Sequence, residues 1–176
     1  IEILADLRDE GRIAAEKIDS VVLSVDPGHL KVCNIQYPDT GLEIKFSLRH
    51  TAAFALAGQD TSSLETYSDA NPRAPALVAL RRRVAVVDDG GPSTLATARV
   101  TLHDGQVLER SFDVGIPAED VAAQRVKIDT KFRSLAMPLL GDEAVALLAD
   151  LHGLECLPDV GALLAHVADW RLSLRH

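Results

Sequence analysis

The stretch ATARVTLHDGQVLERSF, residues 96–112, determines the fold class that we predict. It holds two runs with strand character, 96–102 and 106–112, joined through Asp104-Gly105. An Asp-Gly pair between two such runs is the strongest short-range signal for a β-hairpin. Aliphatic and polar residues alternate in the first run, which places them on opposite faces of a sheet. The expected inward residues are Ala98, Val100 and Leu102.

Upstream of the hairpin, the sequence predicts two more strands and two well-defined helices. The strands are expected at 18–25 (IDSVVLSV) and 84–87, because β-branched and aliphatic side chains dominate both runs. An amphipathic helix is expected from Ile1 to Gly11, and a short helix at 75–82 has Pro75 in its first turn. Residues 29–39 have mixed polarity and are expected to form an irregular connection, and the polar stretch 59–72 has Tyr67 as its one expected anchor.

The segment from Thr40 to Gly58 has features of both a helix and a strand. Thr40 and Glu43 match a capping box, and the Ala-rich second half favours a helix. The first half alternates as a strand would. We predict one helix through the segment, with an alternative start at about Ser47. The expected core stripe of this helix is Phe46, Ala53 and Leu56.

The last third of the chain is predicted to be helical. Pro117 opens a helix that runs to about Ala136, a second helix spans 142–153, and a third runs from Pro158 towards Trp170. Strands and helices in this order indicate an α+β fold, a two-layer sandwich in which helices pack on one face of a largely antiparallel sheet. The length suits a single domain over residues 1–176.

Composition excludes several classes of protein. The chain has 26 acidic against 18 basic side chains and a net charge of −8, whereas a nucleic-acid-binding protein needs a basic surface. The Arg81-Arg82-Arg83 cluster follows a predicted helix and is expected to lie at its C-terminus, where cations are favourable. No apolar run is long enough for a membrane helix. Two distant cysteines, Cys33 and Cys156, favour a reduced, cytoplasmic protein.

Few residues are candidates for chemistry, because the familiar catalytic and phosphate-binding motifs are absent from the sequence. His50 stands beside Arg49 on the predicted central helix. This pair either lies on a solvent-exposed helix face or turns towards an anionic substrate or a neighbouring domain. Lys31, His29 and Cys33 share the connection after the first strand, where a solvated lysine and an inert buried cysteine are the simpler interpretation.

Several segments, taken together, are similar to one known family. They are IDSVVLSV (18–25), TGLEIKFSLRHTAAFALAGQD (40–60), TARVTLHDGQVLERSFD (97–113) and AEDVAAQRVKIDTKFRSLAMPLLG (118–141). In order and spacing they resemble the C-terminal part of the MmgE/PrpD family, which includes 2-methylcitrate dehydratase, cis-aconitate decarboxylase and iminodisuccinate epimerase. The resemblance covers nearly the whole chain, and its best markers are the KFSL segment, the Asp-Gly hairpin and the late KF..LA.P.LG pattern.

This resemblance implies a large helical domain followed by a smaller lid-like domain, with the active site in the cleft between them and no metal or organic cofactor. Family members remove a proton next to a carboxylate of a small di- or tricarboxylate, and then lose water or carbon dioxide or take a proton on the other face. Most family catalytic residues lie upstream of the matching segments. Since the chain starts at Ile1 and not at Met, we expect a C-terminal piece of a larger enzyme that is inactive alone.

The resemblance carries only weak assignments onto this chain. Lys31, Arg49 and His50 are the candidate substrate-binding residues, because the loop after the first strand and the start of the central helix lie near the family's cleft. Val32 stands where some relatives have an aromatic substrate contact. The expected partners are the helical domain of the same protein and a polycarboxylate substrate, in a homodimer of the full-length protein, without nucleic acid or membrane. The alternative is a non-catalytic α+β module that binds a partner protein.

Overall fold

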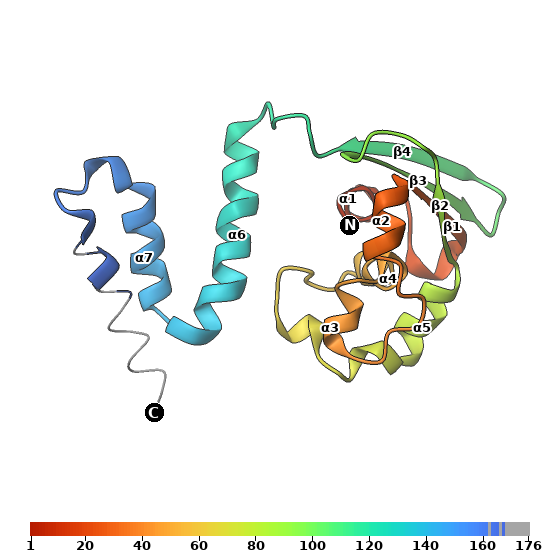
Figure 1. Cartoon of the computed structure of the whole chain (residues 1–176), viewed down its shortest axis with the longest axis horizontal. Coiled ribbons are helices and arrows are strands. Elements are labelled where there is room, and N and C mark those ends of the chain that lie inside the picture. Colours follow the sequence, from red (N-terminus) through yellow and green to blue (C-terminus); the bar gives the residue numbers. More distant parts are fainter. Residues whose placement is uncertain (162, 166, 168–176) are drawn as a thin grey trace. The chain divides into compact units, whose positions relative to one another are not determined.

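The structure, a computed structural model, describes residues 1–161, 163–165 and 167. It divides into two compact units, Ile1–Pro117 and a second unit that begins at Ala118 (Figure 1). The first unit holds all four strands, and the second holds the long helices α6 and α7. The expectation that a single domain spans residues 1–176 stays a prediction.

A four-stranded mixed sheet forms one layer of the first unit, with the strand order β2-β1-β3-β4 (Figure 1). The β1–β2 pair is parallel, whereas β1–β3 and β3–β4 are antiparallel. The α+β fold with a mostly antiparallel sheet is therefore confirmed. The strands are β1 (Ile18–Val25), β2 (Val84–Asp88), β3 (Leu95–Leu102) and β4 (Val107–Asp113).

Helices α1 (Glu2–Asp9), α4 (Leu48–Ala57) and α5 (Pro75–Arg82) contact the sheet and close the core. The predicted alternation of β3 is confirmed, since its inward residues belong to the core cluster. Each fully buried aliphatic side chain contributes about 1.5 to 3 kcal/mol relative to exposure in water. The cluster includes Leu4 and Leu7 of α1, Val21 of β1, Ala98, Val100 and Leu102 of β3, and Ala53 and Leu56 of α4.

The prediction of one helix from Thr40 to Gly58 is wrong, because the segment forms two helices. The capping box at Thr40 is present, but α3 (Gly41–Ile44) ends after four residues. The second helix, α4, begins at Leu48, and Ser47 is its N-cap, accepting a hydrogen bond of 3.2 Å from the His50 amide. The alternative start at about Ser47 is therefore correct for α4.

A short backbone bridge causes the interruption between α3 and α4. Asn34 pairs with Ser47 in an isolated antiparallel bridge, and the Ile35 amide donates to the Phe46 carbonyl at 3.0 Å. The alternating first half of the segment thus pairs as a strand would. As a consequence Phe46 lies outside the core and is 40% exposed, contrary to the prediction, while Ala53 and Leu56 are buried as expected.

Residues 29–39 also differ from the prediction, because the connection after β1 begins with the short helix α2 (Pro27–Val32). Asp26 caps this helix by accepting a hydrogen bond of 2.7 Å from the Gly28 amide, and Pro27 occupies the first turn, where its missing N–H costs nothing. In the polar stretch 59–72, only two single-turn helices form, Glu65–Tyr67 and Asn71–Arg73. Tyr67 anchors the stretch by donating to the Thr61 carbonyl at 3.0 Å.

The second unit contains α6 (Val121–Leu140) and α7 (Glu143–His152), which pack as neighbours. Helix α6 begins four residues later than predicted and continues through Pro138, with Asp120 as its N-cap. His152 and Asp129 link the two helices with a distance of 2.8 Å between Nε2 and Oδ1. The third helix, predicted from Pro158 towards Trp170, is present in part, because residues 160, 161, 163–165 and 167 are helical, while residues 162, 166 and 168–170 lie outside the residues that the structure describes.

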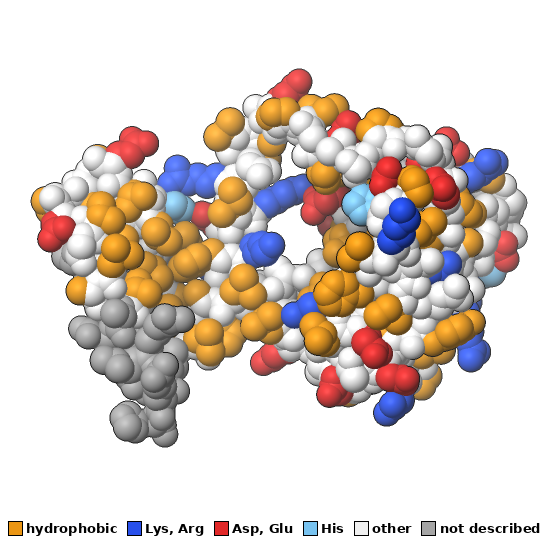
Figure 2. Space-filling view, in the orientation of Figure 1, with side chains coloured by type: hydrophobic (Ala, Val, Ile, Leu, Met, Phe, Trp, Pro, Cys, Tyr) orange, Lys and Arg blue, Asp and Glu red, His pale blue; other side chains and the backbone are white. Residues whose placement is uncertain are grey.

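Hydrophobic side chains remain exposed on the second unit (Figure 2). On α6 and α7 they are Val121, Val126, Ile128, Leu139, Val145 and Leu151, which are 40% to 74% exposed. In the described part of the chain, no helix combines the length and the hydropathy needed to cross a membrane.

Candidate functional site

The connection after β1 and the start of α4 lie side by side, because backbone hydrogen bonds join them. The Leu48 amide donates to the Cys33 carbonyl at 3.0 Å, next to the Asn34–Ser47 bridge. Arg49 then donates from Nη1 to Oδ1 of Asn34. The structure thus brings Arg49 to the segment that directly follows α2, the short helix that carries an exposed Lys31.

His50 points away from this region. Successive residues of a helix are about 100° apart around its axis, so neighbours on α4 face different surroundings. The His50 side chain is 0% exposed and makes an edge-to-face contact with Phe54, with 5.0 Å between ring centroids. Phe54 in turn contacts Tyr67 at 5.6 Å. Arg49 and His50 therefore do not form the side-by-side basic pair that the sequence suggested, and His50 is not exposed to solvent either.

The environment of His50 keeps its imidazole neutral. Neither Nδ1 nor Nε2 has a hydrogen-bond partner among the residues that the structure describes. Burial, and after it the positive charge of Arg81, lowers the pKa of His50 from 6.5 to about 4, although the Asn71 backbone acts in the opposite direction. A neutral histidine at pH 7 offers one N–H donor and one acceptor, but no positive charge for a carboxylate.

Arg81 is a further buried polar residue of this region, and the sequence analysis missed its burial. Its side chain is 8% exposed, and its guanidinium lies over the ring of Tyr37, 5.5 Å from the centroid. Burial, followed by repulsion from Arg82, lowers the pKa of Arg81, while Tyr37 and Asp39 oppose this shift. Helical spacing could have revealed the burial, because Arg81 lies four residues after the core residue Leu77 on α5.

His29, the other histidine of interest, holds α2 against the loop between β2 and β3. Its Nε2 lies 2.8 Å from the Ser93 carbonyl oxygen, a contact in which the ring nitrogen must be the donor. The free thiol of Cys33 is partly buried. Neither group joins Arg49 or His50 through a hydrogen bond. Among the described residues, no three His, Cys, Asp or Glu side chains gather as metal ligands.

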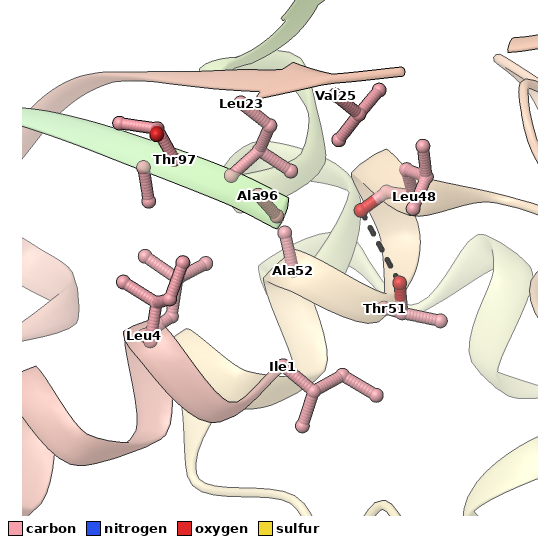
Figure 3. A pocket seen from close by; sticks show the side chains of 11 residues that line it. Ile1, Leu4, Leu23, Val25, Leu48, Thr51, Ala52, Ala96 and Thr97 are labelled. Carbon is pink, nitrogen blue, oxygen red and sulfur yellow. Dashed lines mark hydrogen bonds between the residues drawn. The ribbon is translucent and has the colours of Figure 1, made fainter. Parts of the chain in front are cut away.

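A separate apolar pocket of about 80 Å³ opens between α1, α4 and the sheet (Figure 3). Leu4, Leu23, Ala52 and Ala96 line it, and its one hydroxyl-bearing helix residue, Thr51, donates to the Ser47 and Leu48 carbonyls. Since aliphatic surface dominates the lining and the Thr51 hydroxyl is engaged, this pocket suits an apolar side chain and not a polycarboxylate.

The sequence matches the model of one known family. The family model for the MmgE/PrpD C-terminal domain matches residues 1–152. The chain belongs to the MmgE/PrpD family. The match takes in the whole first unit together with α6 and α7 of the MmgE/PrpD chain, so the resemblance noted in the sequence is confirmed. A search among curated proteins found no match. Substrate binding by Lys31, Arg49 and His50 of this MmgE/PrpD domain stays a prediction.

Proposed function

We propose that this domain is the lid-like part of a cofactor-free lyase or isomerase that acts on small polycarboxylates, with a 2-methylcitrate dehydratase-like reaction. The observation that carries the proposal is the match to the MmgE/PrpD C-terminal domain over residues 1–152. The position of two cationic side chains supports it. Arg49 is held at Asn34, directly after the helix that presents Lys31, so both groups belong to one region of the first unit.

For this reaction, such a lid has to bind negative charge and exclude water. Removal of a proton next to a carboxylate builds up negative charge, which fixed cationic donors stabilise in a site that water has left. Arg49 has five N–H donors and uses one of them on Asn34, so the rest can meet carboxylate oxygens. Lys31 adds a mobile point charge. His50 contributes only if its surroundings rearrange, because its side chain is buried and neutral.

The exposed apolar side chains of the second unit support the further proposal that a helical domain of the same full-length protein packs there. Such a domain would carry the proton-transfer residues, and we propose that the full-length protein is a homodimer. We also propose a cytoplasmic location, which two free thiols support. The same exposed apolar surface also favours the alternative function, a non-catalytic module that binds a partner protein.

The test uses the full-length protein in deuterated water with a chelator present. We would incubate it with 2-methylcitrate, citrate, cis-aconitate and iminodisuccinate and follow the products by NMR. The proposal expects deuterium next to a carboxylate, together with a product of dehydration, decarboxylation or epimerisation. Folded protein that turns over none of the four would remove the substrate class and leave the interaction module as the better hypothesis.

Variants then test the role of the lid. Arg49→Gln should raise KM by roughly tenfold or more, because a charge-assisted hydrogen bond contributes about 1.5 to 3 kcal/mol. Lys31→Gln should raise KM less, since an exposed ammonium is well hydrated. The matched control is Arg82→Gln, an exposed arginine on α5, which should leave KM unchanged. Equal effects of Arg49→Gln and Arg82→Gln would contradict substrate binding by Arg49.

A further inference from the structure

Arg49 is a partly buried arginine whose side chain binds a neutral partner. Its Nη1 donates a hydrogen bond to Oδ1 of Asn34. Two other arginines of the first unit, Arg73 and Arg110, instead pair with carboxylates, at N–O distances of 3.4 and 2.7 Å. Arg49 forms no ion pair with an acidic side chain among the residues that the structure describes. Its positive charge is therefore held in position but not neutralised by the chain.

The backbone fixes both ends of this hydrogen bond. Asn34 pairs with Ser47 in the isolated antiparallel bridge, and the Leu48 amide donates to the Cys33 carbonyl at 3.0 Å. Arg49 follows directly, in the first turn of α4, for which Ser47 is the N-cap. The two side chains thus meet where the connection after β1 crosses the start of α4, and neither has to search for the other.

The chemistry of the contact determines how the Asn34 amide is turned. A guanidinium has donors alone, so the amide must present its oxygen to Arg49. An aspartate in place of Asn34 would have nearly the same shape and would also present an oxygen, but its negative charge would offset that of Arg49. An amide is therefore suited to hold the guanidinium while leaving its charge for another group.

We infer that Asn34 is a positioning residue, which holds the guanidinium of Arg49 in place and, being neutral, leaves its positive charge available to an anionic group of a ligand. That this ligand is the polycarboxylate substrate rests on the proposed function. The hydrogen bond between Asn34 and Arg49, and the absence of a carboxylate from it, do not depend on that function.

A merely structural hydrogen bond would give a different order of variants. Asn34→Asp keeps an oxygen next to Arg49 and strengthens the contact, so a structural role would leave both stability and anion binding intact. In the positioning role, the same variant folds but binds an anion less well, because Arg49 is then already paired. Asn34→Ala keeps the charge of Arg49 and loses its placement, so it should weaken anion binding less than Asn34→Asp does.

The first experiment uses the 176-residue chain with ¹⁵N-labelled arginine, in which Arg49→Lys assigns the Arg49 Nε–H signal in the NMR spectrum. The probe is tricarballylate, an unreactive tricarboxylate, and sodium chloride at equal ionic strength is the reference. We expect tricarballylate to move the Arg49 signal with saturation. Asn34→Asp should weaken this binding roughly tenfold, the effect of losing a charge-assisted hydrogen bond. Asn34→Ala should weaken it roughly threefold, since the side chain has to be ordered on binding.

The matched control is Gln36→Glu, which adds the same charge to an exposed residue two positions further along the segment. It should change the affinity less than about twofold, because water screens an exposed charge. Equal weakening by Asn34→Asp and Gln36→Glu would reduce the effect to general charge and overturn the inference. An Arg49 signal that tricarballylate does not move, or wild-type affinity in Asn34→Asp, would overturn it as well.

A double variant shows whether Asn34 acts through Arg49. In an Arg49→Gln background, Asn34→Asp should weaken tricarballylate binding less than about twofold further, because the charge that it offsets is gone. A full tenfold loss in that background would contradict the positioning role. If Asn34→Asp does not fold, as urea unfolding would show, Asn34→Ala decides, and wild-type affinity in folded Asn34→Ala would overturn the inference.

The second experiment measures KM and kcat of the full-length protein. Asn34→Asp should raise KM for a polycarboxylate roughly tenfold and leave kcat within about twofold, as expected when binding to substrate and transition state is lost equally. The two NMR signatures in a full-length protein that turns over no polycarboxylate would refute the proposed function alone. Turnover with the same KM in the wild-type protein and in Asn34→Asp would refute the positioning role alone.

Discussion

The buried His50 makes the stability of the first unit depend on pH, and the size of the effect can be worked out. The folded pKa of about 4 lies below the unfolded value of 6.5, so the unfolded chain binds the proton more readily. The stabilising contribution of neutral His50 is therefore fully present above the unfolded pKa. It falls as the pH drops through 6.5 and levels off below the folded pKa.

Between pH 7 and pH 5, the linkage relation gives a loss of about 1.8 kcal/mol from this one residue. Because solvent screening reduces such effects where burial is incomplete, we expect about 1 to 1.8 kcal/mol. The variant is His50→Leu, which cannot titrate and leaves no unpartnered nitrogen in the cluster with Phe54. Between pH 7 and pH 5, the free energy of unfolding of His50→Leu should fall less than that of the wild-type chain, and the difference should equal this amount.

The assay is urea unfolding of the 176-residue chain, followed by the ¹⁹F signal of fluorinated Tyr67, which reports on the first unit because this ring packs against Phe54. The matched control is His103→Leu, since His103 is exposed and lies 3.6 Å from Asp19. The control should not flatten the pH dependence. If His50→Leu kept the wild-type slope, or if His103→Leu flattened it equally, the reasoning from burial would be refuted.

Three further predictions concern stability. Gly41→Ala should destabilise the first unit by about 1 to 3 kcal/mol or more, because a Cβ there would meet the Tyr67 carbonyl oxygen at 1.7 Å. Arg83→Met should cost about 2 kcal/mol, since Arg83 donates to the Ile18 carbonyl at 2.7 Å and so joins α5 to β1. Ala96→Val should add about 0.5 to 1.5 kcal/mol by filling part of the apolar pocket with a residue that suits a strand. Urea unfolding measures all three.

Each of these three predictions has an outcome that would contradict it. Gly153→Ala is the control for Gly41→Ala, because its Cβ would meet nothing closer than 3.7 Å, and equal losses would show that the close approach at Gly41 does not matter. Arg82→Met controls for Arg83→Met, and an equal effect would assign the loss to charge alone. A destabilised Ala96→Val would mean that the pocket cannot take two more methyl groups.

The strands and the sheet could be predicted from sequence because their signals are local. The Asp104-Gly105 turn and the alternation in β3 specify register without knowledge of the rest of the chain. The break between α3 and α4 could not be predicted in this way. It depends on the bridge between Asn34 and Ser47, which brings together residues from two separate segments, and this tertiary contact overrides the helical propensity of the intervening chain.

The candidate site also depends on tertiary contacts that local sequence does not reveal. The position of the arginine cluster at the end of α5 was predicted correctly, but its three members have different roles. Arg81 is buried under Tyr37, Arg83 binds backbone carbonyls, and Arg82 is exposed. Charge alone cannot distinguish them, because each role depends on what the neighbouring elements place opposite the side chain. His50 was selected for its polarity, yet its burial follows from the cluster around Phe54.

The parallel pairing of β1 with β2 has a consequence for how the chain acquires its structure. These neighbours in the sheet are separated along the chain by α2, α3, α4 and α5, whereas β3 and β4 are joined by a tight turn. Closing a long loop costs entropy before its contacts form, so the β3–β4 hairpin should assemble early and β2 should join last. Until then β1 presents an open edge, which makes the nascent sheet vulnerable to pairing with other chains during synthesis.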